Sequence, residues 1–271
     1  MNSKRRPQRG YAQVSRPLFT IDSGIPIAYI SGGNYDGEML CVDGEADPGA
    51  EGSMGRDIGF RESDLEPILN PSERSCAYIA GPSGAGKTTY VADLVANHIE
   101  VYPEAEVYLF SRTRGDDDPA FDDLHDAIVQ VTLDNQFCEA PFDCTTLKPG
   151  TVVIFDDCAT IMDDKLRVTV EKCIMDALEV GRKPGVYVIL TSHNIVPHGK
   201  RSFQHSVINE ATDFTVFPGH SSAPELTKVL KDCLGMNAAQ IKKIREAKSR
   251  WVTIHNRGPK YVLEQHNAYM W

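Results

Sequence analysis

The chain has 271 residues, of which 41% are hydrophobic and 24% are charged, an ordinary composition for a globular protein. That length allows one sizeable α/β core with an appendage, or two small domains. No segment approaches the ~20 consecutive apolar residues of a membrane-spanning helix, and the N-terminus lacks the apolar core of a secretory signal. The formal net charge of -10 argues against a surface covered all round with DNA-binding positive charge.

Cysteine and histidine usage argues against disulfides and against a zinc site. The seven cysteines are odd in number and form no Cys-x-x-Cys pair, which predicts free thiols in a reducing compartment. Several of them lie inside apolar runs, so we expect them to be buried. The eight histidines are scattered without the spacing of metal ligands.

The first part of the chain, residues 1–70, is predicted to be an N-terminal appendage. Residues 1–17 are basic and polar, and we expect them to be disordered or ordered by a partner. Three short β-like runs lie between glycine-rich turns, at 18–21, 25–30 and 39–42. Residues 43–70 are rich in Gly, Asp, Glu and Pro, which predicts a linker or a surface arm.

From residue 71 to residue 271, apolar strand-like runs alternate with helix-like segments. The apolar spacing predicts helices over 87–100 and around 170–178. Six strands are expected, at 76–80, 107–110, 128–133, 152–155, 186–190 and 214–217. This alternation predicts an α/β domain with a mostly parallel central sheet flanked by helices.

The C-terminal part has a different pattern. A turn at 256–259 separates apolar runs at 251–255 and 261–264, which predicts a β-hairpin. Residues 228–260 also hold nine lysines and arginines against two acids. This basic segment either follows a nucleic-acid backbone or is a solvated amphipathic helix with Ile241 and Ile244 facing inward.

Residues 81–88 match the phosphate-binding pattern G-x-x-x-x-G-K-[ST] at every fixed position. Glycines let backbone N–H groups curl around phosphate oxygens, and the helix that follows directs its positive dipole end at them. Lys87 supplies a charge to the β- and γ-phosphates, and the Thr88 hydroxyl is offered to Mg²⁺. The predicted nucleotide-binding residues are Gly81, Pro82, Ser83, Gly84, Ala85, Gly86, Lys87, Thr88 and Thr89.

Two carboxylates follow the apolar run 152–155. A buried strand that ends beside the phosphate loop places its last carboxylate near Mg²⁺, so Asp156 is predicted to bind the metal directly or through water. Asp157 is then placed to polarise the attacking water. The alternative for Asp157 is a helix N-cap, a position that aspartate favours.

Polar residues also end the fifth predicted strand. Thr191, Ser192 and Asn194 are candidates to bind the γ-phosphate or the lytic water, or else to cap a turn, and His193 is expected to be structural. Arg182 lies in a turn just before this strand and is the candidate for an arginine that reaches a neighbouring subunit's γ-phosphate. The alternative is a solvated surface arginine, and two rivals for the role are Arg112 and Arg201.

Taken together, these motifs over residues 75–271 resemble the P-loop genome-packaging ATPases of large nucleocytoplasmic DNA viruses. That poxvirus-like group is placed with the FtsK–HerA translocases. The resemblance rests on residues 81–88, 110–112, 118–121, 154–157, 181–182 and 191–194, and residues 250–254 and 261–263 also resemble the end of such proteins. Asp157 is a second acid directly after Asp156, the predicted Mg²⁺ ligand. Two such acids also fit the ATPase branch in which an extra strand lies between the strand before the phosphate loop and the strand before the acids.

The resemblance implies a ring of identical subunits that hydrolyses ATP with Mg²⁺ and drives double-stranded DNA into a preformed capsid. It implies contacts with capsid proteins and a location in the host-cell cytoplasm, at the viral factory, or in the virion. In that scheme Lys87, Asp157, Arg182, Asn194 and Thr191 are the catalytic residues, and Thr88 and Asp156 bind the metal. Residues 1–70 match no part of the family.

Two other functions stay open at this stage. The first is a P-loop nucleotide or small-molecule kinase, whose mobile lid could include residues 199–201; the two-acid strand end argues against it. The second is an assembly or transcription-associated factor that binds ATP as a switch, for which the basic N-terminal arm would serve in docking. A helicase is a close relative of the motor and shares its motifs.

Overall fold

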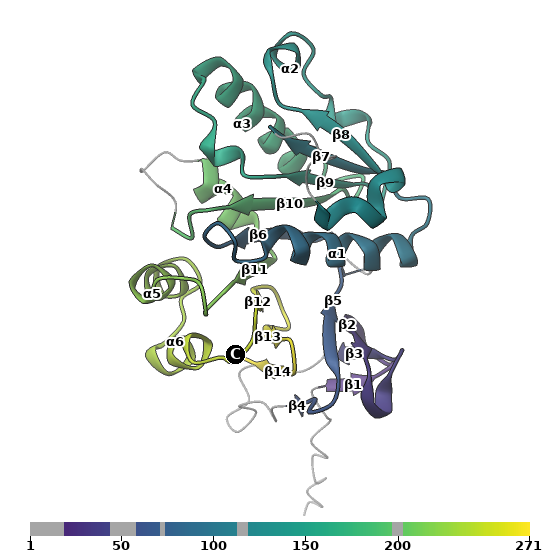
Figure 1. Cartoon of the computed structure of the whole chain (residues 1–271), viewed down its shortest axis with the longest axis vertical. Coiled ribbons are helices and arrows are strands. Elements are labelled where there is room, and N and C mark those ends of the chain that lie inside the picture. The colour runs from purple at the N-terminus through teal and green to yellow at the C-terminus, as the bar shows by residue number, and fades with distance from the viewer. Residues whose placement is uncertain (1–18, 44–57, 71–73, 113–118, 197–202) are drawn as a thin grey trace, which may run out of the picture.

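The computed structural model describes residues 19–43, 58–70, 74–112, 119–196 and 203–271, and it shows a large mixed sheet with a small antiparallel sheet beside one end of it (Figure 1). The expected disordered arm at 1–17 and the candidate lid at 199–201 lie outside the described residues. The predicted α/β class, with a mostly parallel sheet flanked by helices, is confirmed.

The large sheet has ten strands. In their order across the sheet they are β4 (Ile58–Gly59), β14 (Asn267–Met270), β13 (Tyr261–Glu264), β12 (Val252–His255), β11 (Asp213–Val216), β6 (Cys76–Ala80), β10 (Tyr187–Ser192), β9 (Val152–Phe155), β7 (Val107–Ser111) and β8 (Ile128–Thr132). Strands β11 to β8 are mutually parallel and are the six predicted strands. The predicted C-terminal hairpin is β12 and β13, and β14, which was not predicted, extends it antiparallel to β4.

Helices cover both faces of the parallel strands. Alternate strand residues face opposite sides, so the sheet contributes to two separate cores. Helix α1 (Lys87–Val101) and the 3₁₀ segment η3 (Pro119–Ala127) cover one core. The other core is covered by α2 (Asn135–Glu139), α3 (Asp164–Glu179), α4 (Phe203–Glu210), α5 (Ala223–Asp232) and α6 (Ala238–Arg245).

Sequence signals account for the helix ends and faces. Asp163 caps α3 by accepting a hydrogen bond from the Leu166 amide. Asn237 and Gln240 form a capping box at the start of α6. Ile241 and Ile244 of α6 are buried while its lysines and arginine are exposed, so α6 has the amphipathic pattern expected of this stretch, and its exposed cations remain accessible to a ligand.

The small sheet contains four antiparallel strands. In spatial order they are β1 (Phe19–Ile21), β3 (Met39–Val42), β2 (Ile25–Ser31) and β5 (Asp64–Pro67), with a short 3₁₀ turn η1 at Gly33–Tyr35. The first three agree with the predicted β-like runs. Pro67 lacks a backbone donor, and its strand is at the edge of the sheet, where that lack costs least.

The prediction of a linker or surface arm is wrong for residues 58–70. This stretch contains β4 and β5, and the Phe60 and Leu65 side chains are buried. The Phe60 amide donates to the His266 carbonyl at 2.8 Å, and the Leu65 amide donates to the Gln265 carbonyl at 2.7 Å. The alternation of exposed and buried residues in β5 spans only four positions, so the acidic and glycine-rich composition around it concealed the strand.

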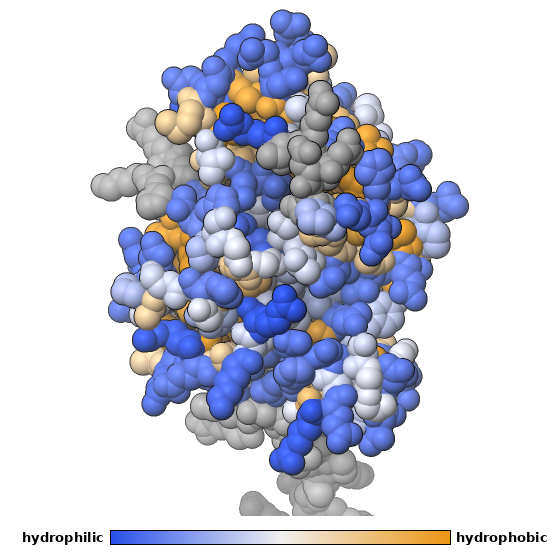
Figure 2. Space-filling model, in the orientation of Figure 1, coloured by the Kyte–Doolittle hydropathy of each residue, from blue (hydrophilic) through white to orange (hydrophobic). Residues whose placement is uncertain are grey.

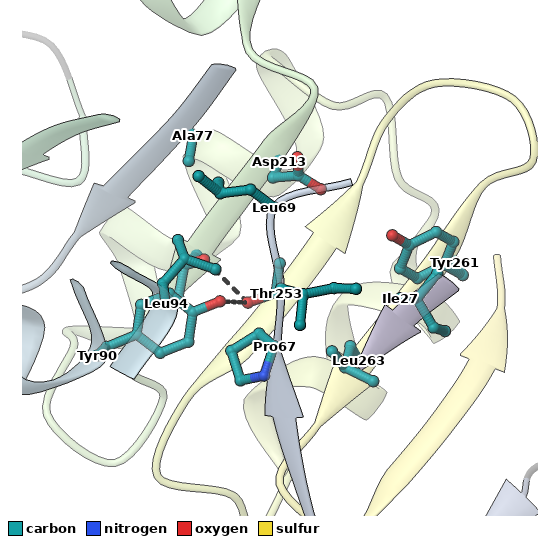
Figure 3. A pocket seen from close by; sticks show the side chains of 12 residues that line it. Ile27, Pro67, Leu69, Ala77, Tyr90, Leu94, Asp213, Thr253, Tyr261 and Leu263 are labelled. Atoms are coloured by element: carbon teal, nitrogen blue, oxygen red, sulfur yellow. Dashed lines mark hydrogen bonds between the residues drawn. The ribbon is translucent and has the colours of Figure 1, made fainter. Parts of the chain in front are cut away.

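The small sheet and the C-terminal strands share one hydrophobic core. Leu40, Leu65 and Phe60 pack with Tyr261, Leu263 and other residues of β13 and β14. Figure 3 shows the layer between this core and α1, where Tyr90 points at Thr253 and their hydroxyl oxygens are 2.6 Å apart. The cavity there holds about 20 Å³, room for a single water molecule, so it is too small for a nucleotide. A boundary between two domains near residue 70 stays a prediction.

Within the described residues, no helix is both long and apolar enough to cross a membrane. The face of the molecule in Figure 2 is mostly hydrophilic, with scattered hydrophobic residues. All seven cysteines are free; five are buried as expected, Cys138 is half-buried and Cys233 is exposed.

We expect the Leu263→Ala variant to lose about 2–5 kcal/mol of unfolding free energy, because truncation of a buried leucine leaves a cavity. Leu263 is 1% exposed and lies where the small sheet meets α1. Urea denaturation followed by circular dichroism measures the loss. Val129→Ala, on strand β8 with 52% exposure, is the control and should change little. A loss below ~1 kcal/mol for Leu263→Ala would contradict a shared core.

Candidate nucleotide-binding site

The phosphate loop connects β6 to α1 at the carboxyl end of the parallel strands. The Gly81 amide donates to the Ser192 carbonyl at 3.0 Å, which ties the start of the loop to the end of β10. Gly84 and Gly86 have positive φ angles of 76° and 95°, a conformation that favours glycine. A Cβ on Gly81 would lie 2.8 Å from the Phe217 ring and 3.2 Å from the Ala85 Cβ, so only glycine fits there.

Lys87 is a buried cation at the first position of α1. Its side chain is 6% exposed, and its Nζ lies 3.4 Å from the Pro82 carbonyl and 3.1 Å from His193 Nδ1. Among the described residues, no carboxylate oxygen lies within 4.0 Å of this ammonium. Burial lowers the pKa of Lys87, and the more distant carboxylates of Asp157 and Asp156 oppose that shift. A buried ammonium without an ion-pair partner, at the positive end of a helix, favours an incoming anion.

The two predicted acids follow β9 and face the end of β10. Thr191 is 1% exposed and joins them: its hydroxyl donates to Asp156 Oδ1 at 2.7 Å and accepts from the Asp157 amide at 2.9 Å. Strand β10 lies between β6 and β9, which is the extra strand expected between the two motif strands. Thr191 therefore fixes the position of the acids relative to the phosphate loop.

Asp157 has an uncommon backbone conformation and a specific partner. Its φ of 46° is in the left-handed region, which a non-glycine residue rarely occupies. It precedes the 3₁₀ segment η5 (Cys158–Thr160), but its side chain makes no capping hydrogen bond. Asp157 Oδ2 instead lies 2.8 Å from His193 Nε2, while Oδ1 is buried without a hydrogen-bond partner among the described residues.

His193 was expected to be structural, yet it lies between Lys87 and Asp157. One sequence signal could have indicated His193 as a site residue: it directly follows β10, whose polar end had already made Thr191 a candidate. Ser192 and Asn194 behave as a turn: the Ser192 hydroxyl accepts from the Asn194 amide and donates to the Asn194 carbonyl. The role of the Asn194 side chain stays a prediction.

The three candidate arginines lie at different places. Arg182 is exposed in the turn before β10, at the opposite end of the strands from the phosphate loop of the same chain. Arg112 is exposed just after β7, at the same end as the loop. Arg201 lies outside the described residues. Arg182 thus cannot act on this chain's own loop, and a role toward a neighbouring subunit stays a prediction.

The oxygen ligands at this site fit Mg²⁺ bound together with a nucleotide. The described residues hold no cluster of three or more His, Cys, Asp or Glu side chains able to bind a metal on their own. Mg²⁺ in phosphate sites takes one or two protein oxygens and completes its shell with water and phosphate. The Asp156 carboxylate, just after β9, and the Thr88 hydroxyl, at the start of α1, supply that chemistry.

A glycine-rich loop between β6 and α1, with acids at the end of β9 and one strand between, defines the P-loop NTPase fold. No protein-family model matches the chain. It is 32% identical over 243 residues to the uncharacterized protein V3 of Sputnik virophage, which covers 90% of this chain and 94% of that protein. The chain belongs to the family of that virophage protein.

Two of the solved structures that are similar to this chain are a conjugation protein and a viral packaging protein. The pCW3 conjugation coupling protein TcpA, in its monomer form with ATPγS, has a TM-score of 0.51 and 12% identity, covering 90% of this chain and 77% of that one. The genome packaging NTPase B204 from Sulfolobus turreted icosahedral virus 2, in complex with sulfate, has a TM-score of 0.47 and 14% identity, covering 71% of this chain and 96% of that one. The similarity to TcpA establishes the fold alone.

We expect Gly81→Ala to weaken nucleotide binding by about tenfold or more, because the new methyl group forces the phosphate loop away from Phe217. Binding of a fluorescent ATP analogue measures the change. The control is Gly219→Ala, where an added Cβ has no atom within 4 Å, and binding should be unaffected. Unchanged affinity in Gly81→Ala would show that the loop geometry is not needed for binding.

Proposed function

We propose that the protein is a Mg²⁺-dependent ATPase that translocates double-stranded DNA and packages a viral genome. The observation that carries the ATPase part is the buried Lys87 ammonium, which has no carboxylate partner among the described residues and lies beside two acids held by Thr191. A phosphate chain would provide the missing negative charge at the start of α1. ATP rather than GTP is expected from the class, since no base-recognition motif is visible in the sequence.

Hydrolysis would use the geometry at the ends of β9 and β10. A water molecule loses a proton to the Asp157 carboxylate as its oxygen bonds to the γ-phosphorus. The bond from that phosphorus to the β–γ bridging oxygen breaks, which leaves ADP and inorganic phosphate. Bound through Thr88 and Asp156, Mg²⁺ would neutralise developing charge on the phosphates. Thr191 keeps both acids in place, and Asn194 is proposed to face the γ-phosphate.

The two-acid end of β9 favours hydrolysis over transfer to a small acceptor. Asp156 accepts a hydrogen bond from Thr191 and is the proposed Mg²⁺ ligand. Asp157 is then the acid that remains to act on water. A kinase needs a group that orients its acceptor and a pocket to hold it. The small cavity between α1 and the small sheet could not hold such an acceptor.

The DNA part of the proposal rests on family and charge. The chain belongs to a virophage family, and B204 is named as a genome packaging NTPase. The exposed lysines and arginines of the basic segment could follow a phosphate backbone, on a protein that is otherwise acidic. A homo-oligomeric ring, contact with capsid proteins and a place in the host-cell cytoplasm or virion complete the proposal. Arg182 is proposed to act across the ring interface.

We expect Lys87→Ala to abolish ATP hydrolysis, because the variant loses the cation that stabilises charge on the transferred phosphoryl group. Phosphate release by the full chain, with and without long double-stranded DNA, measures this. Wild-type turnover should rise with DNA. The exposed Lys165 on α3 gives a matched control, and Lys165→Ala should keep both turnover and stimulation.

The outcomes separate the candidate functions. DNA-stimulated turnover that Lys87→Ala eliminates supports the motor. Turnover that ignores DNA but requires a small acceptor would favour the kinase. Binding of ATP without any turnover, in both the presence and the absence of DNA, would favour an assembly factor that uses ATP as a switch.

We expect neutralisation of the basic segment to weaken DNA binding and to reduce its salt dependence. Each Lys or Arg contact to a phosphate releases counterions from the DNA, and the variant makes fewer such contacts. The test variant is Lys242→Gln/Arg245→Gln/Lys248→Gln, all exposed on or just after α6. Fluorescence anisotropy at several salt concentrations should show the slope of log affinity against log salt falling by roughly three. A charge-matched triple variant on α3, Lys165→Gln/Arg167→Gln/Lys172→Gln, should keep the wild-type slope; equal losses in both would mean a non-specific effect of net charge.

A further inference from the structure

The imidazole of His193 joins the phosphate loop to the acidic strand end. Its Nδ1 is 3.1 Å from Lys87 Nζ, and its Nε2 is 2.8 Å from Asp157 Oδ2. The three side chains come from the start of α1, from the second residue after β9 and from the first residue after β10. No other described side chain contacts both Lys87 and Asp157 within hydrogen-bond distance.

The chemistry of the partners fixes the tautomer of a neutral His193. A lysine ammonium has only donors, so Nδ1 must accept from it. The ring proton is then on Nε2, where it donates to the Asp157 carboxylate. Both ring nitrogens of His193 are therefore engaged, each with a different part of the site.

This contact restricts how Asp157 can act. With Oδ2 held by His193, the oxygen that remains for a water proton is Oδ1, which is buried and has no partner among the described residues. The left-handed backbone at Asp157 sets the direction of the side chain, and His193 sets its rotation. An unpartnered buried carboxylate oxygen is costly unless a ligand or a water uses it.

Phosphate would compete with His193 for Lys87. A γ-phosphate at the loop offers the ammonium several anionic acceptors in place of one imidazole nitrogen and one carbonyl. Lys87 would then turn toward the phosphate, and Nδ1 of His193 would lose its donor while Nε2 keeps Asp157. Phosphate at the loop thus changes the state of a residue that touches the proposed base.

We propose that His193 is a positioning residue that holds Asp157 for attack on water and exchanges its Lys87 contact when phosphate binds. This inference rests on the proposed ATPase function and adds a physical link between phosphate at the loop and the acid that acts on water. It predicts that His193 affects the chemical step rather than nucleotide affinity.

The kinetic test uses the full chain with His193→Ala and His193→Gln. His193→Ala should lower kcat about 10–100-fold with little change in KM, a typical effect of losing a group that orients a catalytic one. His193→Gln keeps an N–H donor and should recover part of the loss. His205→Ala, an exposed histidine on α4, is the control and should match the wild type. The double variant His193→Ala/Asp157→Asn should be no slower than Asp157→Asn alone.

A spectroscopic test reports the exchange directly. With ¹⁵N-labelled histidine, the His193 signals are assigned by their loss in His193→Gln. The free protein should show the Nε2–H form with Nδ1 hydrogen-bonded, and ATPγS should shift Nδ1 in the same direction as Lys87→Met does without ligand. No shift in Nδ1 on removal of Lys87 would overturn the contact, and no shift with ATPγS would overturn the exchange.

Failure of this inference is distinguishable from failure of the proposed function. If Lys87→Ala and Asp157→Asn abolish turnover but His193→Ala keeps the wild-type kcat, only the role of His193 is wrong. If no variant changes turnover, the ATPase assignment of the site is wrong. A fall in thermal stability equal in His193→Ala and His193→Gln, without a kcat difference between them, would indicate a purely structural residue.

Discussion

Burial of the Lys87 ammonium is the constraint on which the rest of the site depends. Moving a cation out of water is unfavourable, and no carboxylate in the described part of the chain lies within ion-pair distance to offset this cost. The carbonyl of Pro82 and the ring of His193 satisfy its donors only with neutral groups. The loop glycines, the start of α1 and the acids after β9 form a site that only a bound anion would complete.

The order of strands in the sheet then decides which side chains meet. Because β10 inserts between β6 and β9, its last residues contact both the loop and the acids. Thr191 reaches Asp156, and the Ser192 carbonyl holds Gly81. Two hydrophobic cores, one on each face, fix these strands rigidly, since strand residues pack alternately against α1 on one side and α3 on the other. The polar edge is therefore supported by well-packed layers.

Local signals were predictable from the sequence, and contacts between distant segments were not. The phosphate loop needs a fixed order of residues in one short segment, so the pattern was visible, as were the six parallel strands and the inward face of α6. The contacts of His193 with Lys87 and Asp157 were not predicted, because they depend on which strand lies beside which, and a sequence gives strand order in space only indirectly. Strand β5 was missed because four residues carry too little alternation. Strand β14 is equally short, although it forms a local hairpin with β13. Helices α4 and α5 were not predicted either, although Leu226, Val229 and Leu230 of α5 are buried at helical spacing.

The pairing of β4 with β14 and the core shared by the small sheet with β13 have a consequence for synthesis. The four strands of the small sheet are all synthesised by residue 67, but the core that they share with β13 and β14 can be completed only after those last strands are made. Until then residues such as Leu40 and Leu65 stay exposed to water, in a nascent polypeptide whose parallel strands are already able to assemble. The interval between those two events is when this protein is most open to aggregation and to capture by chaperones.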